Sequence, residues 1–567
     1  MVATHGLLAI SLAVLAGAFF SAASGAIVEY TFQVQNLTVN KLCNTRVITA
    51  VNGTLPGPII NVTEGDTLVV HVINNSPYNL TIHWHGIFQL LSGWADGPSY
   101  ITQCPIPPNG GIYTYRFNVT KQQGTLWWHA HVSLLRATVY GGLIIRPKSG
   151  SYPFLKPYAE VPIILGEYWN ADVVAVENEA LASGFVPNNS DAYTINGRPG
   201  NLYPCSVNDM YNLTVTPGKT YLLRIINAAL NNQLFFKIAG HNFTVVAADA
   251  SYVTPYKTDV IVLAPGQTAD ALFTANQYPG AYYMATHPYI SAQNVGFDNT
   301  TATGLVLYQG ASSSSPVMPS LPAFNDTPTA NKFYTSLTSL VVAPNWVPVA
   351  PKVDQEMFTT AGLGFTPCPT CQIPIQGLQG LRFSASMNNR SFQLPTTALL
   401  QAHYYNIPGV YTTDFPNQPP FAFNYTDPSI SLSPLAITLK STSVKKLKFN
   451  STVQVIFQNT ALVGVESHPM HLHGFNFHVL AQGFGNYNAT TACNKFNYYN
   501  PQIRNTIAVP VGGWAVIRFT ANNPGIWFLH CHLDVHLPWG LAMAFEVDNG
   551  GTPDSTLPPP PADLPKC

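Results

Sequence analysis

Three short segments with alternating apolar and polar residues recur along the chain, one in each third. They are residues 67–73, 220–226 and 453–457. Alternation with period two is typical of a strand with one buried face. Each segment follows a glycine, proline or polar turn and is followed by a pair that contains asparagine, so one strand-and-turn unit recurs. The pattern predicts an all-β protein built as three Greek-key β-sandwiches.

The length of 567 residues allows three domains of ordinary size. We place them at residues 27–150, 159–311 and 346–567. Residues 312–345 open with Ser-Ser-Ser-Ser-Pro and are rich in proline and threonine. That composition is typical of an interdomain linker.

The first 26 residues have the features of a secretory signal peptide. An apolar stretch at residues 7–20 precedes small residues, and we expect cleavage near Ala23 to Ala26. A retained membrane anchor is the alternative, although the run is short for a spanning helix. Export is supported by fifteen Asn-X-Ser/Thr sequons, among them Asn36, Asn79, Asn212, Asn299, Asn389 and Asn488. We therefore expect a secreted protein with N-linked glycans.

Composition narrows the range of partners. Only 9% of the residues are charged and the net charge is −1, which gives no electrostatic reason to expect nucleic acid or an anionic membrane as a partner. Aromatic residues at 12% and 47 prolines favour a large β-rich globule. We expect a monomer that acts on small molecules.

The tripeptide His530-Cys531-His532 is the most informative motif. In an extended segment, side chains alternate, so the thiolate points to one face and both imidazoles point to the other. One tripeptide can therefore reach two metal sites. A thiolate with two imidazoles is the donor set of a type 1 copper, and Cys531 and His536 supply two of these donors. The alternative is an ordinary buried thiol beside unrelated histidines, which requires the rest of the chain to lack partners.

Such partners are present, because three further His-X-His pairs occur. Together with His468 and His536 the four pairs supply ten imidazoles, and a type 1 site uses two of them with the thiolate. The remaining eight suit a three-copper cluster held by two, three and three histidines, for which copper is a better candidate than zinc. The four pairs are His83 and His85, His129 and His131, His471 and His473, and His530 and His532.

These motifs resemble those of plant laccases in the multicopper oxidase family, over nearly the whole mature chain. The matching segments are His83-Trp-His-Gly-Ile-Phe-Gln with Gly93-Trp-Ala-Asp-Gly-Pro98, Trp127-Trp-His-Ala-His131, His468-Pro-Met-His-Leu-His-Gly474 and His530-Cys-His-Leu-Asp-Val-His536. Segments 99–106 and 537–541 are more similar to the corresponding segments of laccases than to those of ascorbate oxidases. The resemblance implies three cupredoxin-like Greek-key β-sandwich domains, with the cluster between the first and the third.

The resemblance also implies four copper ions and their ligands. The axial position of the type 1 site corresponds to Leu541, which cannot ligate, so we expect a higher reduction potential than in a relative with an axial methionine. Asp96 and Asp534 match positions that relay protons to the cluster, although Asp96 in its Asp-Gly turn could merely cap that turn. The implied ligands are His468, Cys531 and His536 for type 1 copper, His83 and His471 for type 2 copper, and His85, His129, His131, His473, His530 and His532 for the type 3 pair.

The implied activity is that of a laccase of the apoplast or cell wall. Phenols give up one electron at a time, whereas reduction of O2 to water takes four, and a type 1 copper joined to a three-copper cluster resolves this mismatch. Monolignols and other lignin-related phenols are the implied substrates, flavonoids remain an alternative, and the role in lignin can be polymerisation or degradation. The alternatives are an oxidase of ascorbate or of a metal ion, and a wall protein that keeps the fold without turnover. With only 8 methionines, a cuprous oxidase is disfavoured.

The eight cysteines are consistent with secretion, because most cysteines in a secreted protein form disulfides. By resemblance, Cys43 pairs with Cys205 and Cys104 pairs with Cys567. Pairing among the other three stays open, with a loop disulfide and one free thiol favoured over a zinc or redox site; these are Cys368, Cys371 and Cys493.

Overall fold

The computed structural model describes residues 25–567 except 293–294, 312–314, 372, 374–376 and 431–433. The predicted signal peptide therefore lies outside the described residues, apart from its last two. No helix among the described residues is long and apolar enough to cross a membrane.

The first sandwich is built from two four-stranded sheets, in the orders β2-β1-β4-β6 and β3-β8-β7-β5. Phe32, Trp84 and Trp128 are buried in the core between them. The strands are β1 (Ile27–Lys41), β2 (Asn44–Val51), β3 (Ile60–Thr63), β4 (Thr67–Asn74), β5 (Ile82–His85), β6 (Gly111–Asn118), β7 (Gly124–Ala130) and β8 (Tyr140–Arg146).

The second sandwich pairs a six-stranded sheet, β10-β9-β12-β17-β14-β15, with a five-stranded one, β11-β19-β18-β13-β16. Its strands are β9 (Ala159–Tyr168), β10 (Ala192–Ile195), β11 (Tyr211–Val215), β12 (Thr220–Asn227), β13 (Gln233–Ile238), β14 (Phe243–Ala248), β15 (Ser251–Thr258), β16 (Ile261–Leu263), β17 (Thr268–Thr274), β18 (Ala281–Tyr289) and β19 (Ala302–Tyr308).

The third sandwich pairs an eight-stranded sheet, β23-β22-β21-β20-β25-β30-β27-β28, with a five-stranded one, β24-β32-β31-β26-β29. Its strands are β20 (Gln355–Pro367), β21 (Leu381–Met387), β22 (Arg390–Phe392), β23 (Leu439–Ser441), β24 (Val444–Leu447), β25 (Thr452–Asn459), β26 (His468–Leu472), β27 (Phe477–Phe484), β28 (Gln502–Arg504), β29 (Thr506–Val509), β30 (Gly513–Thr520), β31 (Gly525–Cys531) and β32 (Ala542–Val547).

Helices are short and connect or cover the sheets. In the predicted linker, α2 packs Phe333 and Tyr334 into the core of the second sandwich. The α-helices are α1 (Val173–Ser183), α2 (Thr327–Ser336), α3 (Leu399–Tyr405) and α4 (Ala489–Ala492). The 3-10 turns are η1 (Gly93–Ala95), η2 (Ser133–Ala137), η3 (Pro428–Ile430), η4 (Pro434–Ala436), η5 (Cys493–Lys495), η6 (Asp534–His536) and η7 (Pro553–Ser555).

The recurring unit expected from the sequence is present in all three sandwiches. β4, β12 and β25 each pair in parallel with the first long strand of their domain and antiparallel with a later strand. The asparagine at the end of each strand, Asn74, Asn227 or Asn459, is buried, and its amide donates hydrogen bonds to loop carbonyls. The polar residue after the apolar run therefore holds the following loop in each domain.

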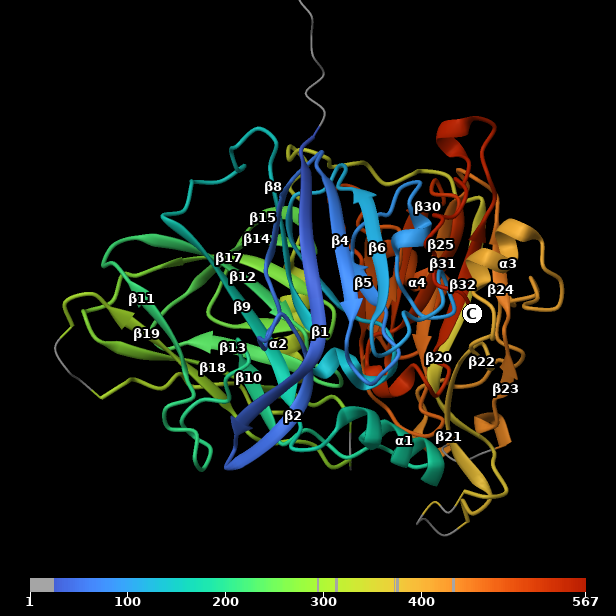
Figure 1. The fold of residues 1–567 in the computed structure, drawn as a ribbon. Coiled ribbons are helices and arrows are strands. Elements are labelled where there is room, and N and C mark those ends of the chain that lie inside the picture. The colour runs from blue at the N-terminus through green and yellow to red at the C-terminus, as the bar shows by residue number, and fades with distance from the viewer. Residues whose placement is uncertain (1–24, 293–294, 312–314, 372, 374–376, 431–433) are drawn as a thin grey trace, which may run out of the picture.

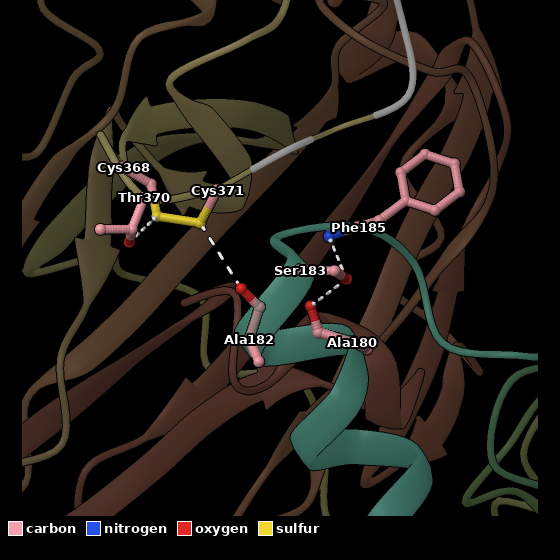
Figure 2. Close-up of a disulfide and its surroundings, with 7 residues drawn as sticks. All are labelled: Ala180, Ala182, Ser183, Phe185, Cys368, Thr370 and Cys371. Carbon is pink, nitrogen blue, oxygen red and sulfur yellow. Dashed lines mark hydrogen bonds between the residues drawn. A yellow bond between two sulfur atoms is a disulfide. The ribbon is translucent and has the colours of Figure 1, made fainter.

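Figure 1 shows the N-terminal sandwich in blue between the green middle sandwich and the orange and red C-terminal one. Two disulfides join the domains, Cys43–Cys205 and Cys104–Cys567, as the resemblance implied. Cys368 and Cys371 form a loop disulfide beside the end of α1, where the carbonyl of Ala182 faces Cys371 Sγ (Figure 2). Among the described residues Cys493 and Cys531 are the free thiols, which confirms the favoured loop disulfide with one thiol left over beside Cys531.

Candidate metal centre

The three predicted type 1 donors meet in the third sandwich. His468 begins β26, Cys531 ends β31, and His536 ends the turn η6. Cys531 Sγ lies 3.7 Å from His468 Nδ1 and 3.4 Å from His536 Nδ1, and all three side chains are buried. Burial raises the pKa of the Cys531 thiol well above its usual value, so a thiolate here requires a bound cation.

Leu541 lies next to these donors. Its carbonyl accepts a hydrogen bond from the Cys531 amide at 3.0 Å, and its own amide donates to the His536 carbonyl at 3.0 Å. The side chain is fully buried in the core of the third sandwich. An apolar side chain held here by two backbone hydrogen bonds offers no donor atom to a metal.

The eight remaining histidines lie on, or directly after, the strands of two antiparallel pairs. β5 and β7 set His83 opposite His129, and β26 and β31 set His471 opposite His530. The alternation expected from the sequence holds, because the residue between each strand histidine pair points into a core: Trp84 into the first sandwich and Cys531 into the third. The first and third domains together therefore enclose one cluster of imidazoles.

The imidazole nitrogens in this cluster face one another. His83 Nε2 lies 3.4 Å from His471 Nε2, and His85 Nδ1 lies 3.1 Å from His532 Nε2. His530 Nε2 lies 3.1 Å from His473 Nε2. Groups of three whose donor atoms all lie within 4.8 Å of one another are His83, His471 and His473; His83, His85 and His129; and His131, His473 and His530.

The chemistry of the cluster fits metal ions. His129 Nε2 is buried and has no hydrogen-bond partner in the part of the chain that the structure describes, which is costly unless a cation binds it. Burial, together with the charges of His83 and Arg136, lowers the pKa of His530 to about 3. Burial also lowers the pKa values of most of the others, which keeps them as the neutral imidazoles that bind copper; they are His85, His129, His131, His471, His473 and His532.

Oxygen acceptors hold the histidines in a ligating orientation. His83 Nδ1 donates to the Asp96 carbonyl at 2.7 Å, and His471 Nδ1 donates to the Asn505 carbonyl at 2.9 Å. His530 Nδ1 donates to the Cys531 carbonyl at 2.9 Å. Because Nδ1 carries the proton in each case, Nε2 is left free toward the centre of the cluster.

Asp96 lies directly on the cluster. Its Oδ2 accepts a hydrogen bond from His473 Nδ1 at 2.9 Å, and its Oδ1 lies 3.3 Å from His83 Nδ1. The following Gly97 has φ +97°, and a Cβ there would lie 1.8 Å from the Ile82 carbonyl oxygen. The Asp-Gly turn therefore places the carboxylate between histidines of two domains.

Asp534 is linked to the cluster through Arg136. Arg136 Nη1 lies 3.8 Å from Asp534 Oδ1 and donates to His532 Nδ1 at 3.0 Å. Arg136 Nη2 also donates to the carbonyls of Leu230 and His532, so one buried guanidinium joins the three domains. Sequence reasoning missed Arg136, although a charged residue five positions after His131 in an otherwise uncharged stretch was a usable signal.

The middle domain supplies none of the described residues in these donor groups but shapes the cluster. Gly266 has φ +91°, and a Cβ there would lie 2.9 Å from His85 Cε1 and 3.1 Å from the His532 ring. Trp127 Nε1 donates to the Gly266 carbonyl at 3.2 Å. The backbone of the middle domain thus closes one side of the cluster.

A cavity of about 570 Å³ lies beside His536, where the middle and third domains meet. This is the size of a small-molecule site. Its walls are mainly apolar and include Phe365, Phe383 and Trp539. Glu466 also lines it, and Glu466 Oε1 lies 3.2 Å from His536 Nε2. Sequence reasoning missed Glu466, although it lies only two residues before His468.

Comparison with known proteins identifies the class of this chain. Multicopper oxidase family models match residues 33–150, 159–311 and 414–551. The crystal structure of a laccase from Botrytis aclada matches with a TM-score of 0.72 and 28% identity, covering 94% of this chain and 89% of that one. The chain therefore belongs to the multicopper oxidase family.

Within that family the similarity to plant laccases is high. Laccase-7 of Arabidopsis thaliana is 62% identical, with 98% of this chain and 99% of the relative covered. Laccase-24 of Oryza sativa subsp. japonica is 56% identical, with 96% and 97% covered. The enzyme is a laccase with four copper ions as its cofactor, and it couples the oxidation of phenols to the reduction of O2. The predicted family, cupredoxin-like fold, enzyme class and cofactor are confirmed.

Proposed function

We propose a specific assignment of the four copper ions. His468, Cys531 and His536 would hold the type 1 ion, and His83 and His471 the type 2 ion. The type 3 ions would be held by two sets of three, His85, His129 and His532, and His131, His473 and His530. The close group of His131, His473 and His530 supports one type 3 set. The nitrogens of His85 and His532 that face each other, and His129 Nε2, which has no hydrogen-bond partner among the described residues, support the other. The facing Nε2 atoms of His83 and His471 support the type 2 pair. When bound, the ions accept single electrons at the type 1 site and deliver four to O2 at the cluster.

The chain provides a short electron path between the two sites. Cys531 is bonded to His530 and His532, so the peptide itself connects the thiolate to ligands of both type 3 ions. A second connection is the hydrogen bond from His530 Nδ1 to the Cys531 carbonyl. Both connections are buried, which limits reorganisation of water as the charge moves.

We place the phenol in the cavity beside His536. Aromatic walls would hold its ring, and Glu466 would accept the hydrogen bond of its hydroxyl and direct that oxygen toward the edge of His536. Glu466→Gln should lower kcat/KM for methoxyphenols by roughly tenfold, because the amide no longer offers a charged acceptor. Ferrocyanide, which has no hydroxyl, is the control donor, and its oxidation should not slow, because loss of a negative charge does not repel an anionic donor. An equal loss for both donors would contradict a role in orienting the phenol.

Leu541→Met tests the axial position. A thioether in this place stabilises Cu(II) relative to Cu(I), so the potential of the type 1 site should fall. A tenfold change in relative affinity for the two oxidation states corresponds to about 59 mV for one electron. Redox titration of the blue absorption measures the shift, with Leu447→Met in the same core as the control. An unchanged or raised potential in Leu541→Met would refute the axial assignment.

We assign proton delivery to Asp96 and Asp534 and propose lignin-related phenols in the apoplast as the physiological setting. The apolar N-terminal stretch and the sequons support secretion of a glycosylated protein. The side chains of Asn36, Asn79, Asn212, Asn299 and Asn488 are exposed, whereas Asn74, also in a sequon, is buried and fully engaged in hydrogen bonds. Glycans would therefore be found at the exposed group and not at Asn74.

The decisive experiment is spectroscopic. The secreted protein should contain about four coppers per chain and show an intense blue band, bleached by a methoxyphenol without air and restored by O2. A protein that stays colourless and inert after copper reconstitution would contradict the ligand assignment.

A further inference from the structure

A carboxylate of the middle domain reaches the first domain close to the cluster. Glu177 lies on α1, whose Val173 and Val176 pack into the core of the first sandwich. This packing sets α1 against η2, the turn that follows His131. There the Ser133 hydroxyl donates a hydrogen bond to Glu177 Oε2. Ser133 has φ +51°, a strained backbone for serine, and the contact with Glu177 helps to hold it.

Glu177 shares a cavity of about 140 Å³ with the cluster. The same cavity is lined by Arg136 and Asp534 and by His131 and His530. Its volume accommodates several water molecules. Glu177 is half-buried, whereas Asp534 is only 7% exposed. The cavity therefore has one carboxylate nearer to solvent and one nearer to the histidines.

Asp534, the inner carboxylate, has an oxygen that can still accept a hydrogen bond. Asp534 Oδ2 is buried and has no hydrogen-bond partner among the described residues, while Oδ1 faces Arg136 at 3.8 Å. A buried carboxylate oxygen of this kind is normally satisfied by ordered water. Water in the cavity would connect Asp534 to Glu177.

The reaction requires a route that brings protons to the copper cluster. Four phenols and one O2 give four phenoxyl radicals and two waters, so each phenol loses one electron and one proton. The protons leave in the cavity beside His536, on the Cys531 face of β31, whereas O2 is reduced on the opposite face, which carries His530. The four protons consumed there must arrive by a separate route.

We propose that Glu177 is the entry residue of that route: it takes a proton from solvent and passes it through water in this cavity toward Asp534. The inference rests on the copper assignment proposed above and adds a residue from the middle domain to it. Glu177 touches no copper ligand and acts through water and Asp534.

The surroundings of Glu177 suit proton transfer near neutral pH. Burial, the largest cause, and the negative charge of Asp534 on η6 together raise the pKa of Glu177 to about 7. Hydrogen bonds from the Ser133 hydroxyl and the Leu134 backbone act in the opposite direction. Arg136 on η2 is the cation that lines the same cavity. A carboxyl group with this pKa can both hold and release a proton at working pH.

Glu177→Gln and Glu177→Asp test the proposal, with Glu179→Gln on the exposed face of α1 as the matched control. Stopped-flow absorption would follow two steps separately. Anaerobic bleaching of the blue band by a methoxyphenol and a content of four coppers should match the wild type in all variants. Reoxidation by O2 should be roughly tenfold slower or more in Glu177→Gln, largely restored in Glu177→Asp and normal in Glu179→Gln.

The pH dependence has a defined sign. Glu177 donates only when protonated, and its raised pKa keeps it protonated below about pH 7. The reoxidation rate of the wild type should therefore fall as the pH rises through about 7, and Glu177→Gln should lack this inflection. Equal reoxidation rates and equal pH profiles in the wild type and Glu177→Gln would overturn the proposal.

A measurement without copper completes the test. Infrared spectra of the copper-free protein, wild type minus Glu177→Gln, should show a protonated carboxyl band that disappears with a midpoint near pH 7. A midpoint near the ordinary glutamate value of about 4.3 would overturn the proposal, even if the variants bind no copper. Failure of the wild type to bleach with phenol or to bind four coppers would instead count against the copper assignment.

Discussion

Cys531→Ser should abolish the blue band and lower phenol turnover by at least about a thousandfold, as expected when a residue essential to one step is removed. A serine hydroxyl at this buried position does not replace the thiolate, which is the soft donor of the type 1 site. The eight cluster histidines lie on the opposite face of the strands and should still hold three coppers.

Copper analysis, the visible spectrum and turnover of a methoxyphenol in air measure this result. Cys493→Ser is the matched control, because Cys493 is the other free thiol among the described residues and lies exposed, away from both sites. It should retain four coppers and full activity. A blue, active Cys531→Ser enzyme would refute the type 1 assignment.

Asp96→Asn should lower O2 reduction by about a hundredfold while the bleaching of the blue band by phenol stays normal. Asp96 Oδ2 accepts a hydrogen bond from His473 Nδ1 at 2.9 Å, and Asp96 Oδ1 lies 3.3 Å from His83 Nδ1. An amide removes the negative charge and the basic oxygen at this position, and general acid-base groups contribute about 10²-fold or more to rates.

Stopped-flow reoxidation by O2 and copper analysis distinguish the possible roles of Asp96. Asp548→Asn is the control, at a half-exposed carboxylate paired with Lys446, and should change neither the reoxidation rate nor the copper content. If Asp96→Asn binds all four coppers and reduces O2 at the normal rate, the role of Asp96 is only to cap its turn. Loss of cluster copper would assign it to positioning His83 and His473, not to proton delivery.

The amino-acid sequence by itself determined the local geometry of the ligands. A strand alternates its side chains, so His83 and His85 had to share a face, and Cys531 had to point away from His530 and His532. The same local rule located β4, β12 and β25. The choice of copper followed from the residue types and their pattern, because one thiolate with two imidazoles suits a type 1 copper, and eight paired imidazoles do not match the closed four-ligand sites of structural zinc.

Only the tertiary structure decided which groups meet. The contact between Asp96 and His473 spans 377 residues, and that between Arg136 and His532 spans 396. Glu466 and Glu177 look like ordinary surface carboxylates in the sequence, and packing of the third and middle domains brings them to His536 and to the cluster cavity. Local alternation fixes the direction in which a side chain points, but its distant neighbours depend on how three separately folded cores pack together.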